Sequence, residues 1–210
     1  MRIERVRAGG PIDVPVVNVG YRSTNYWVIG AGPARLLVDL GWPGTMGALR
    51  AEMTRKGVPL SEIRSGLATH YHPDHAGLAQ ELKNAGMTLL VLESQLDALP
   101  RMRVWTKPAD GFVDIELHDN VNLAFAASRQ RLAGIGLAGE ILPTPGHSDD
   151  SVALLLDDGS AFTGDLTPPG AAEERDAERV AASWRRLRER GATRVYPGHG
   201  PVRPLLATMD

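Results

Sequence analysis

The sequence contains no cysteine among its 210 residues, and only 5% of its side chains are aromatic. The absence of cysteine excludes disulfide bonds, thiolate metal ligands and a cysteine nucleophile, three features on which many small enzymes depend. Because no thiolate is available, imidazole nitrogens and carboxylate oxygens are the donors left for a divalent metal ion.

An excess of charge of either sign is also missing, since 23 Lys and Arg face 25 Asp and Glu, a formal net charge of −2. Nucleic-acid-binding surfaces carry clustered basic residues, so we expect no nucleic-acid partner. No stretch approaches the roughly 18 consecutive apolar residues of a membrane span, so we expect no membrane partner. The N-terminus, MRIERVRAGG, lacks the apolar core of a secretory signal. We expect a cytoplasmic protein with a small-molecule substrate, and the sequence leaves its oligomeric state open.

The hydrophobic pattern predicts one α/β domain over residues 1–210, in which strands and helices alternate. The expected strands cover 2–7, 14–19, 26–29, 35–39, 66–69, 88–92, 140–142, 152–156, 160–163 and 194–196. The expected helices cover about 46–56, 76–85, 119–132 and 172–190, with glycine after several of them as a stop signal. The region 97–135 is the least regular part of the pattern.

Five of the six histidines lie in three short segments, each directly after an expected strand. The segments are HYHPDH with His70, His72 and His75, PTPGH with His147, and YPGHG with His199. Asp165 also follows a strand. Because open α/β sheets place their binding crevices at the carboxyl ends of strands, these side chains can converge.

The number of donors decides the kind of site that the segments predict. Taken singly, Asp74 is explained as a helix N-cap, and Asp165 or His147 as a turn residue. Taken together, five histidines and two aspartates are too many for one tetrahedral ion. They suit two divalent ions about 3.5–4 Å apart that share a carboxylate and a hydroxide. The sequence therefore predicts two divalent ions, Zn²⁺ first, with Fe or Mn as alternatives.

In chain order, H-x-H-x-D-H at 70–75, Pro-Gly-His147, Thr-Gly-Asp165 and Pro-Gly-His199 resemble the metallo-β-lactamase-fold superfamily, in its glyoxalase-II-like branch. The resemblance implies a four-layer αββα sandwich, in which two mixed β-sheets are flanked by helices and the metals lie at one sheet edge. It implies a first metal on His70, His72 and His147. It implies a second metal on Asp74, His75 and His199, with Asp165 as the bridge.

The resemblance also separates ligands from other polar residues. Asp39 matches an early strand-end aspartate of the superfamily that orders the histidine-rich loop. His118 matches no motif, and we expect it to be a partly exposed non-ligand.

A hydroxide held between two metal ions is a nucleophile at neutral pH. The sequence thus predicts a metal-dependent hydrolase of a thioester, ester or lactone, with Asp74 and Asp165 as catalytic residues. The alternative is a persulfide dioxygenase of the same fold, with one iron on His70, His147 and Asp165. A phosphodiesterase or nuclease and a non-catalytic metal-binding domain are further alternatives. Only 33 residues separate Asp165 from His199, too few for the insertion that nucleases of this fold carry.

The substrate class can be narrowed further. The chain ends 11 residues after His199, which leaves no room for the glutathione-binding domain of glyoxalase II, so we expect a different substrate. The irregular region 97–135 is expected to form a lid over the metals. Its cations and aromatic group suit an anionic acyl carrier, and they are Arg101, Arg103, Trp105 and Lys107.

Overall fold

The computed structural model describes residues 14–30 and 32–205, so the strand expected at 2–7 lies outside the described residues. Its strands are β1 (Val16–Asn18), β2 (Trp27–Ile29), β3 (Arg35–Val38), β4 (Ile63–Leu67), β5 (Thr88–Leu92), β6 (Val121–Leu123), β7 (Gly139–Pro143), β8 (Val152–Leu156), β9 (Ser160–Gly164), β10 (Arg194–Pro197) and β11 (Arg203–Pro204). Its α-helices are α1 (Met46–Arg55), α2 (Pro73–Ala76), α3 (Ala79–Asn84), α4 (Ser128–Ala133) and α5 (Ala177–Glu189). Short 3₁₀ helices are η1 (Leu60–Glu62), η2 (Glu93–Gln95), η3 (Leu99–Trp105), η4 (Pro108–Asp110), η5 (Phe125–Ala127) and η6 (Pro169–Ala171).

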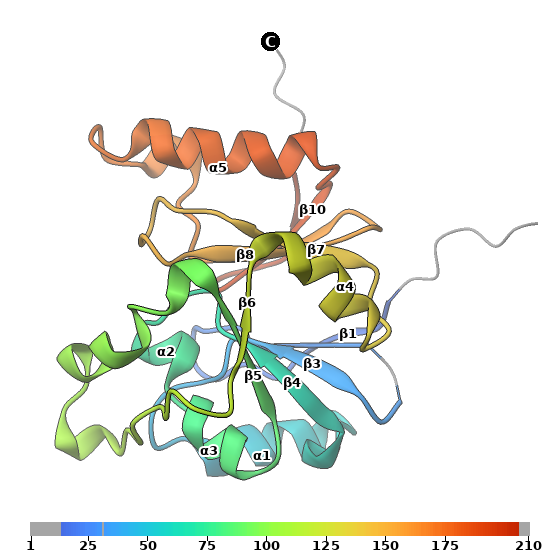
Figure 1. The fold of residues 1–210 in the computed structure, drawn as a ribbon, viewed down its shortest axis with the longest axis vertical. Coiled ribbons are helices and arrows are strands. Elements are labelled where there is room, and N and C mark those ends of the chain that lie inside the picture. The colour runs from blue at the N-terminus through green and yellow to red at the C-terminus, as the bar shows by residue number, and fades with distance from the viewer. Residues whose placement is uncertain (1–13, 31, 206–210) are drawn as a thin grey trace, which may run out of the picture.

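The strands form two mixed sheets that stack face to face. The first has the order β1-β2-β3-β4-β5-β6, with the pairs from β3 to β6 parallel. The second has the order β11-β10-β9-β8-β7, with β9 and β10 parallel. Figure 1 shows α5 on the outer face of the second sheet and α1 and α3 on the outer face of the first. The expected arrangement of two mixed sheets flanked by helices is confirmed.

Alternation along the strands explains why both faces of each sheet are buried. In β8, Val152, Leu154 and Leu156 join the apolar layer between the sheets, whereas Ala153 and Leu155 join the layer under α5. Strands covered on both faces are expected to be continuous apolar runs, and β8 reads VALLL. The helix α5 covers its side of the sheet with Val180, Trp184 and Leu187, which lie at helical spacing.

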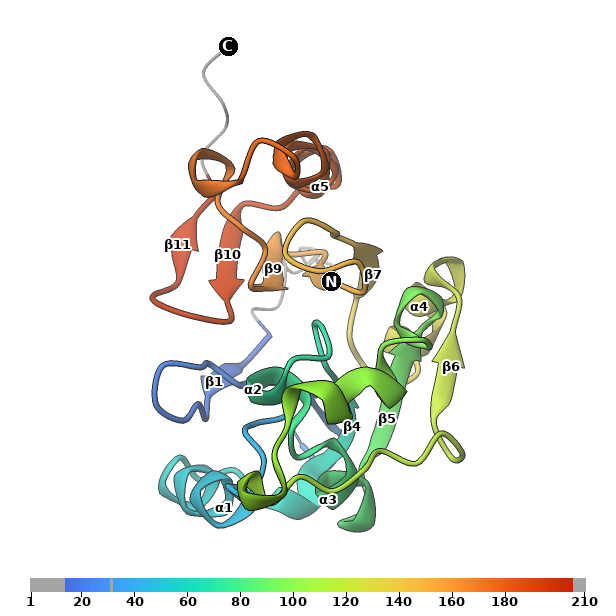
Figure 2. The same cartoon turned by 90° about the vertical axis from the view of Figure 1, so that its left-hand side faces the viewer.

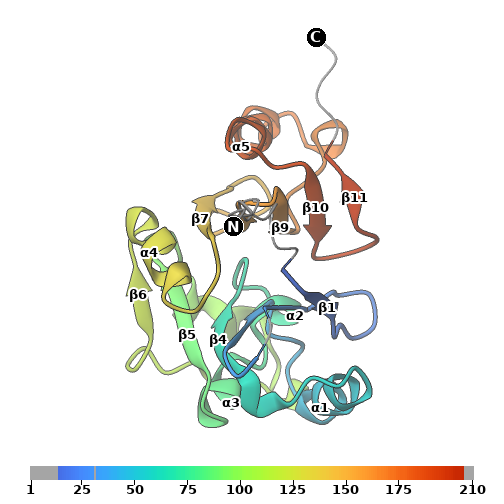
Figure 3. The ribbon, with the colours of Figure 1, turned by 90° about the vertical axis from the view of Figure 1, so that its right-hand side faces the viewer.

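Two helix predictions were wrong in detail. The helix expected over 76–85 is split into α2 and α3 at Gly77, where a Cβ atom would lie 2.3 Å from Pro43 Cδ. The helix expected over 119–132 is replaced by β6, η5 and α4. Pairing of β6 with β5 turns Val121 and Leu123 toward the inter-sheet layer, and this tertiary burial overrides helix propensity. Figure 3 shows β6 and α4 together at one side of the molecule.

Other boundaries differ by a few residues. The strand expected at 66–69 is β4, which ends at Leu67, so that residues 68–72 leave the sheet. The helix α5 begins at Ala177 and not near 172, because η6 and a turn precede it, and β11 was not expected. None of the helices in the part of the chain that the structure describes has the length and the apolar character to cross a membrane.

Candidate metal centre

The strand directions bring the histidine segments to one edge of the sandwich. The strands β7, β9 and β10 run the same way, because β8 is antiparallel to both β7 and β9 and because β10 is parallel to β9. The loops after them carry His147, Asp165 and His199, while the segment after β4, which runs into α2, carries His70, His72 and His75. Figure 2 shows the molecule from the side on which this edge lies, with α2 near the middle of the view.

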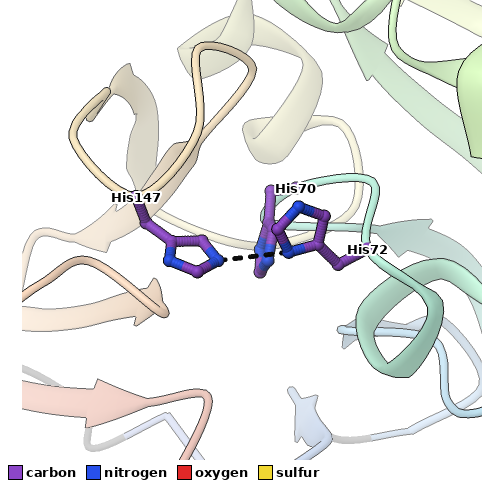
Figure 4. A group of neighbouring side chains, drawn as sticks. All are labelled: His70, His72 and His147. Carbon is purple, nitrogen blue, oxygen red and sulfur yellow. Dashed lines mark hydrogen bonds between the residues drawn. The ribbon is translucent and has the colours of Figure 1, made fainter. Parts of the chain in front are cut away.

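The first group of donors consists of His70, His72 and His147, whose ligand atoms all lie within 4.8 Å of one another. His147 Nε2 is 3.2 Å from His72 Nδ1, and Figure 4 shows the three imidazoles facing one another. His70 is only 1% exposed, and His147 lies closer to the surface. Three nitrogens that converge without an oxygen acceptor are typical of a metal site.

The second group consists of Asp74, His75 and His199, again with ligand atoms within 4.8 Å of one another. Asp74 Oδ2 lies 3.2 Å from the Nε2 atoms of both histidines. Two of the candidate groups thus have the composition that the motifs had assigned to two metals, and a third group, His70, His75 and Asp165, joins the two sets.

Asp165 lies between the groups. Its Oδ1 is 3.4 Å from His75 Nε2, and its Oδ2 is 3.4 Å from His199 Nε2 and 3.9 Å from His147 Nε2. One carboxylate thus reaches both groups, as a bridging ligand must.

Two glycines make room for this carboxylate. A Cβ on Gly198 would lie 2.5 Å from Asp165 Oδ1. Gly164 has φ of +51°, and a Cβ there would lie 2.1 Å from Thr69 Oγ1. Any larger residue at either position has to displace Asp165 or the histidine-rich loop.

The Nδ1 atoms of three histidines contact neighbouring oxygen atoms, and their Nε2 atoms are on the opposite side of the ring. His75 Nδ1 lies 2.9 Å from Asp39 Oδ2, and Asp39 Oδ1 accepts hydrogen bonds from the Thr69 amide and hydroxyl, both at 2.8 Å. Asp39 therefore orders the histidine-rich loop, as the resemblance implied. His199 Nδ1 lies 2.8 Å from the Ser23 carbonyl oxygen, and His70 Nδ1 lies 3.2 Å from Thr69 Oγ1. Such contacts leave each Nε2 free to face the centre.

Burial and neighbouring charges both shift the pKa values of these groups. Burial, together with the neighbouring histidines, holds the pKa of His70 well below its usual range, so its nitrogen lone pair is available. Burial also opposes charge on His75, but Asp39, Asp165 and Asp74 outweigh it and raise the pKa of His75. Burial favours a protonated Asp74, yet His75 and the Thr24 hydroxyl lower the pKa of Asp74 to about 2. The centre thus concentrates carboxylate charge that a cation can neutralise.

Orphaned polar atoms test whether a metal fits. His70 Nε2, His75 Nε2 and Asp165 Oδ1 are buried and have no hydrogen-bond partner in residues 14–30 and 32–205. A buried donor or acceptor left unpaired costs about 1–3 kcal/mol. All three atoms belong to the converging groups, so a divalent ion would satisfy them together, and the residues present fit such an ion.

Other residues named from the sequence lie around the centre or away from it. The ring of Trp105 is 5.5 Å from that of His72, so η3 reaches the site. The guanidinium of Arg103 is not free to face the site, because it pairs with the carboxylate of Asp114 at 2.6 and 2.7 Å. His118 lies apart beside Glu116 with a side chain 69% exposed, as expected for a non-ligand.

Two contacts of the site escaped sequence reasoning. Thr24 donates a hydrogen bond to Asp74 Oδ2 at 3.1 Å, and the Ser23 carbonyl holds His199. Thr24 is buried in the turn before β2, 50 residues from Asp74. No local motif marks such a partner, since the contact exists only after the chain has folded.

The family model described as "Metallo-beta-lactamase superfamily" matches residues 19–199 of this chain. The chain belongs to the metallo-beta-lactamase superfamily. Among solved structures of the superfamily fold, the chain is similar to a metallo-beta-lactamase family protein from Thermus thermophilus, with a TM-score of 0.65 and 21% identity over 90% of this chain and 74% of that one. It is also similar to TTHA1623 in a di-iron-bound form, with a TM-score of 0.66 and 26% identity over 91% and 94% of the two chains.

Curated relatives of this superfamily member are about a quarter identical to it over the aligned residues. "Beta-lactamase-like protein 2 homolog" of Caenorhabditis elegans is 27% identical over 86% of this chain and 57% of the relative. "Atrochrysone carboxyl ACP thioesterase" of Aspergillus fumigatus is 27% identical over 96% of this chain and 56% of the relative. The chain thus spans little more than half the length of these two relatives.

Proposed function

We propose that this superfamily member is a binuclear metallohydrolase that cleaves a thioester, ester or lactone of a small molecule in the cytoplasm. The observation that carries the proposal is the position of Asp165, whose Oδ2 lies 3.9 Å from His147 of the first group and 3.4 Å from His199 of the second, while its Oδ1 lies 3.4 Å from His75. The one-iron alternative uses His70 and His147 of the first group together with Asp165, so the metal content of the protein decides between the two.

Two divalent ions on these residues would supply a hydroxide nucleophile at neutral pH and would polarise the carbonyl oxygen of the substrate. In the overall reaction a C–O bond forms between water and the acyl carbon, the C–S or C–O bond breaks, and the thiol or alcohol leaves with a proton. Asp74 stays a carboxylate throughout the neutral pH range, because its pKa is about 2. Thr24 fixes the orientation of Asp74 by its hydrogen bond.

The thioester preference is supported by one relative, the fungal protein named as an acyl-carrier-protein thioesterase. For the metals we favour zinc, because histidine and carboxylate donors suit it. The related structure in a di-iron-bound form makes iron the alternative, since the same donors accept either metal.

The test combines metal analysis with activity. We expect about two ions per chain after purification without chelator, and hydrolysis of acyl thioesters or lactones by that protein. Dialysis against a chelator should remove both the ions and the activity, and Zn²⁺ should restore them. One iron per chain with oxygen consumption on a persulfide would replace this proposal by the mononuclear dioxygenase with His70, His147 and Asp165. Turnover of phosphodiesters alone would also refute it.

A further inference from the structure

A small hollow beside the metal centre has one wall of candidate ligands and another with a cation. It has a volume of about 240 Å³, and its lining includes His147, Asp165 and His199 together with Arg203. The segment 164–168 after β9 forms its floor. The hollow therefore begins at the reacting centre and extends toward β11.

Arg203 is held in place at the far wall. It lies in β11, where Val195 of β10 is its register partner. Its guanidinium carbon is 6.0 Å from the centre of the Trp184 ring, and Trp184 Nε1 in turn donates to the Thr167 carbonyl at 2.7 Å. Thr167 itself lines the hollow. An aromatic face under a guanidinium restricts the arginine without neutralising its charge.

Among residues 14–30 and 32–205, the charge of Arg203 is not matched by a carboxylate. Within the described residues, no carboxylate oxygen comes within 4.0 Å of its side-chain nitrogens, whereas Arg129 and Arg190 each approach a carboxylate to 2.9 Å. Arg203 is also only partly exposed. A partly buried, oriented guanidinium without a carboxylate is suited to accept an anion from outside the chain.

We propose that Arg203 binds an anionic group on the acyl part of the substrate, so that the enzyme prefers acyl groups ending in a carboxylate. This inference rests on the proposed hydrolase function. Pockets for whole drug-sized ligands measure roughly 300–1,000 Å³, so this smaller hollow suits a short acyl group. The leaving group then lies on the other side of the centre, where Trp105 is 61% exposed beside His72.

Two thioesters of one neutral thiol, N-acetylcysteamine, test the preference. The S-glutaryl and S-pentanoyl compounds have acyl chains of equal length, but only the first ends in a carboxylate. We expect the wild-type metal-loaded protein to prefer the glutaryl compound in kcat/KM. In R203Q this preference should fall at least about tenfold, mainly through KM, because a charge-assisted hydrogen bond is lost. R203K should keep part of the preference, since it keeps the charge.

Arg64, which is exposed on β4, supplies the matched control. R64Q removes the same charge away from the hollow and should leave the preference unchanged. An equal loss for both thioesters in folded R203Q would assign Arg203 a structural role and overturn the inference. A wild-type protein without any preference would overturn it as well.

A binding measurement separates this inference from the proposed function. Calorimetry on the metal-loaded protein should show glutarate binding more tightly than pentanoate, and R203Q should lower the glutarate affinity at least about tenfold, toward that of pentanoate. If neither thioester is hydrolysed but this difference is present, the proposed reaction fails and the anion site stands. If both thioesters are hydrolysed and R203Q binds glutarate as the wild type does, the anion site fails and the hydrolase stands.

Discussion

The two sheets contribute to the metal centre in different ways. The first sheet supplies four donors from one loop of six residues, 70–75, whereas the second supplies His147, Asp165 and His199 singly from the ends of three strands. The four donors are close together in the sequence, although Asp39 and Thr24, which hold them, come from residues 30 and 50 positions away. The three single donors meet only because β7, β9 and β10 run in the same direction and their sheet packs on the first one. One half of the centre depends on a local motif and the other on long-range packing.

Replacing Asp165, the donor shared by both halves, should have the largest effect. In Asp165→Ala we expect kcat/KM for a thioester to fall more than about 100-fold, because even the partners that orient ligands are worth 10–100-fold. Metal analysis should show fewer than two ions per chain. A variant that keeps two ions and full activity would contradict the bridging position.

His70 tests the half supplied by the loop. In His70→Ala we expect a loss of activity of at least about 100-fold, together with the loss of about one ion per chain. The comparison variant is His199→Ala, which removes one donor of the second group, located in the loop after β10. If His70→Ala retained both ions, the first donor group would be wrongly composed.

Asp39 tests the support beneath that loop. Asp39→Asn keeps an oxygen for Thr69 but removes the charge beside His75 Nδ1. Metal affinity should fall about 10–100-fold while the fold is kept. Competition with a coloured chelator measures this, and circular dichroism checks the fold. An unchanged affinity would limit Asp39 to a packing role.

The packing on which the second half depends can be weakened at Leu154, which is fully buried between the sheets. Leu154→Ala should lower the free energy of unfolding by about 2–5 kcal/mol. Activity at low temperature should change far less, because Leu154 does not touch the donors. Denaturant unfolding of the variant and of wild type gives the difference. A change below about 0.5 kcal/mol would show that the sheets do not rely on this contact.

The smallest effect is expected at His118. His118→Ala should retain activity within about twofold, since exposed positions away from special features rarely change stability by more than about 0.5 kcal/mol. A variant as inactive as Asp165→Ala, yet folded, would overturn the division of the six histidines.

The contrast between local and long-range contacts also explains which elements could be predicted from the sequence. The strands β5 and β8 were predicted correctly, because continuous apolar runs with glycine-rich or acidic turns permit few other assignments. The prediction failed over 119–132, where pairing with β5 decides the structure, and it missed the break at Gly77, whose amide donates a hydrogen bond to the Gly41 carbonyl outside the helix. Long-range contacts of this kind have no local signature.

The residues of the site also divide into those that a local motif predicts and those that only the fold brings together. The motifs named seven donors that lie together in the structure, where a third group, His70, His75 and Asp165, joins the two predicted sets; their roles as ligands stay predictions. The Thr24 contact and the Arg203 hollow were not foreseen, because each joins segments distant in sequence. Trp105 was expected near the substrate and does lie beside His72, while its neighbour Arg103 is already paired with Asp114.

The close packing at Gly164 and Gly198 has a consequence for how this protein can be altered. Main chain, rather than a side chain, touches Asp165 and Thr69 there, so the spacing between the donor groups is fixed by the backbones of β9 and β10. Changes that tune the substrate can accumulate in the hollow near Arg203 or around Trp105 without disturbing this spacing. Substitutions intended to change the substrate should therefore be made near Arg203 and around Trp105, and Gly164 and Gly198 should be kept.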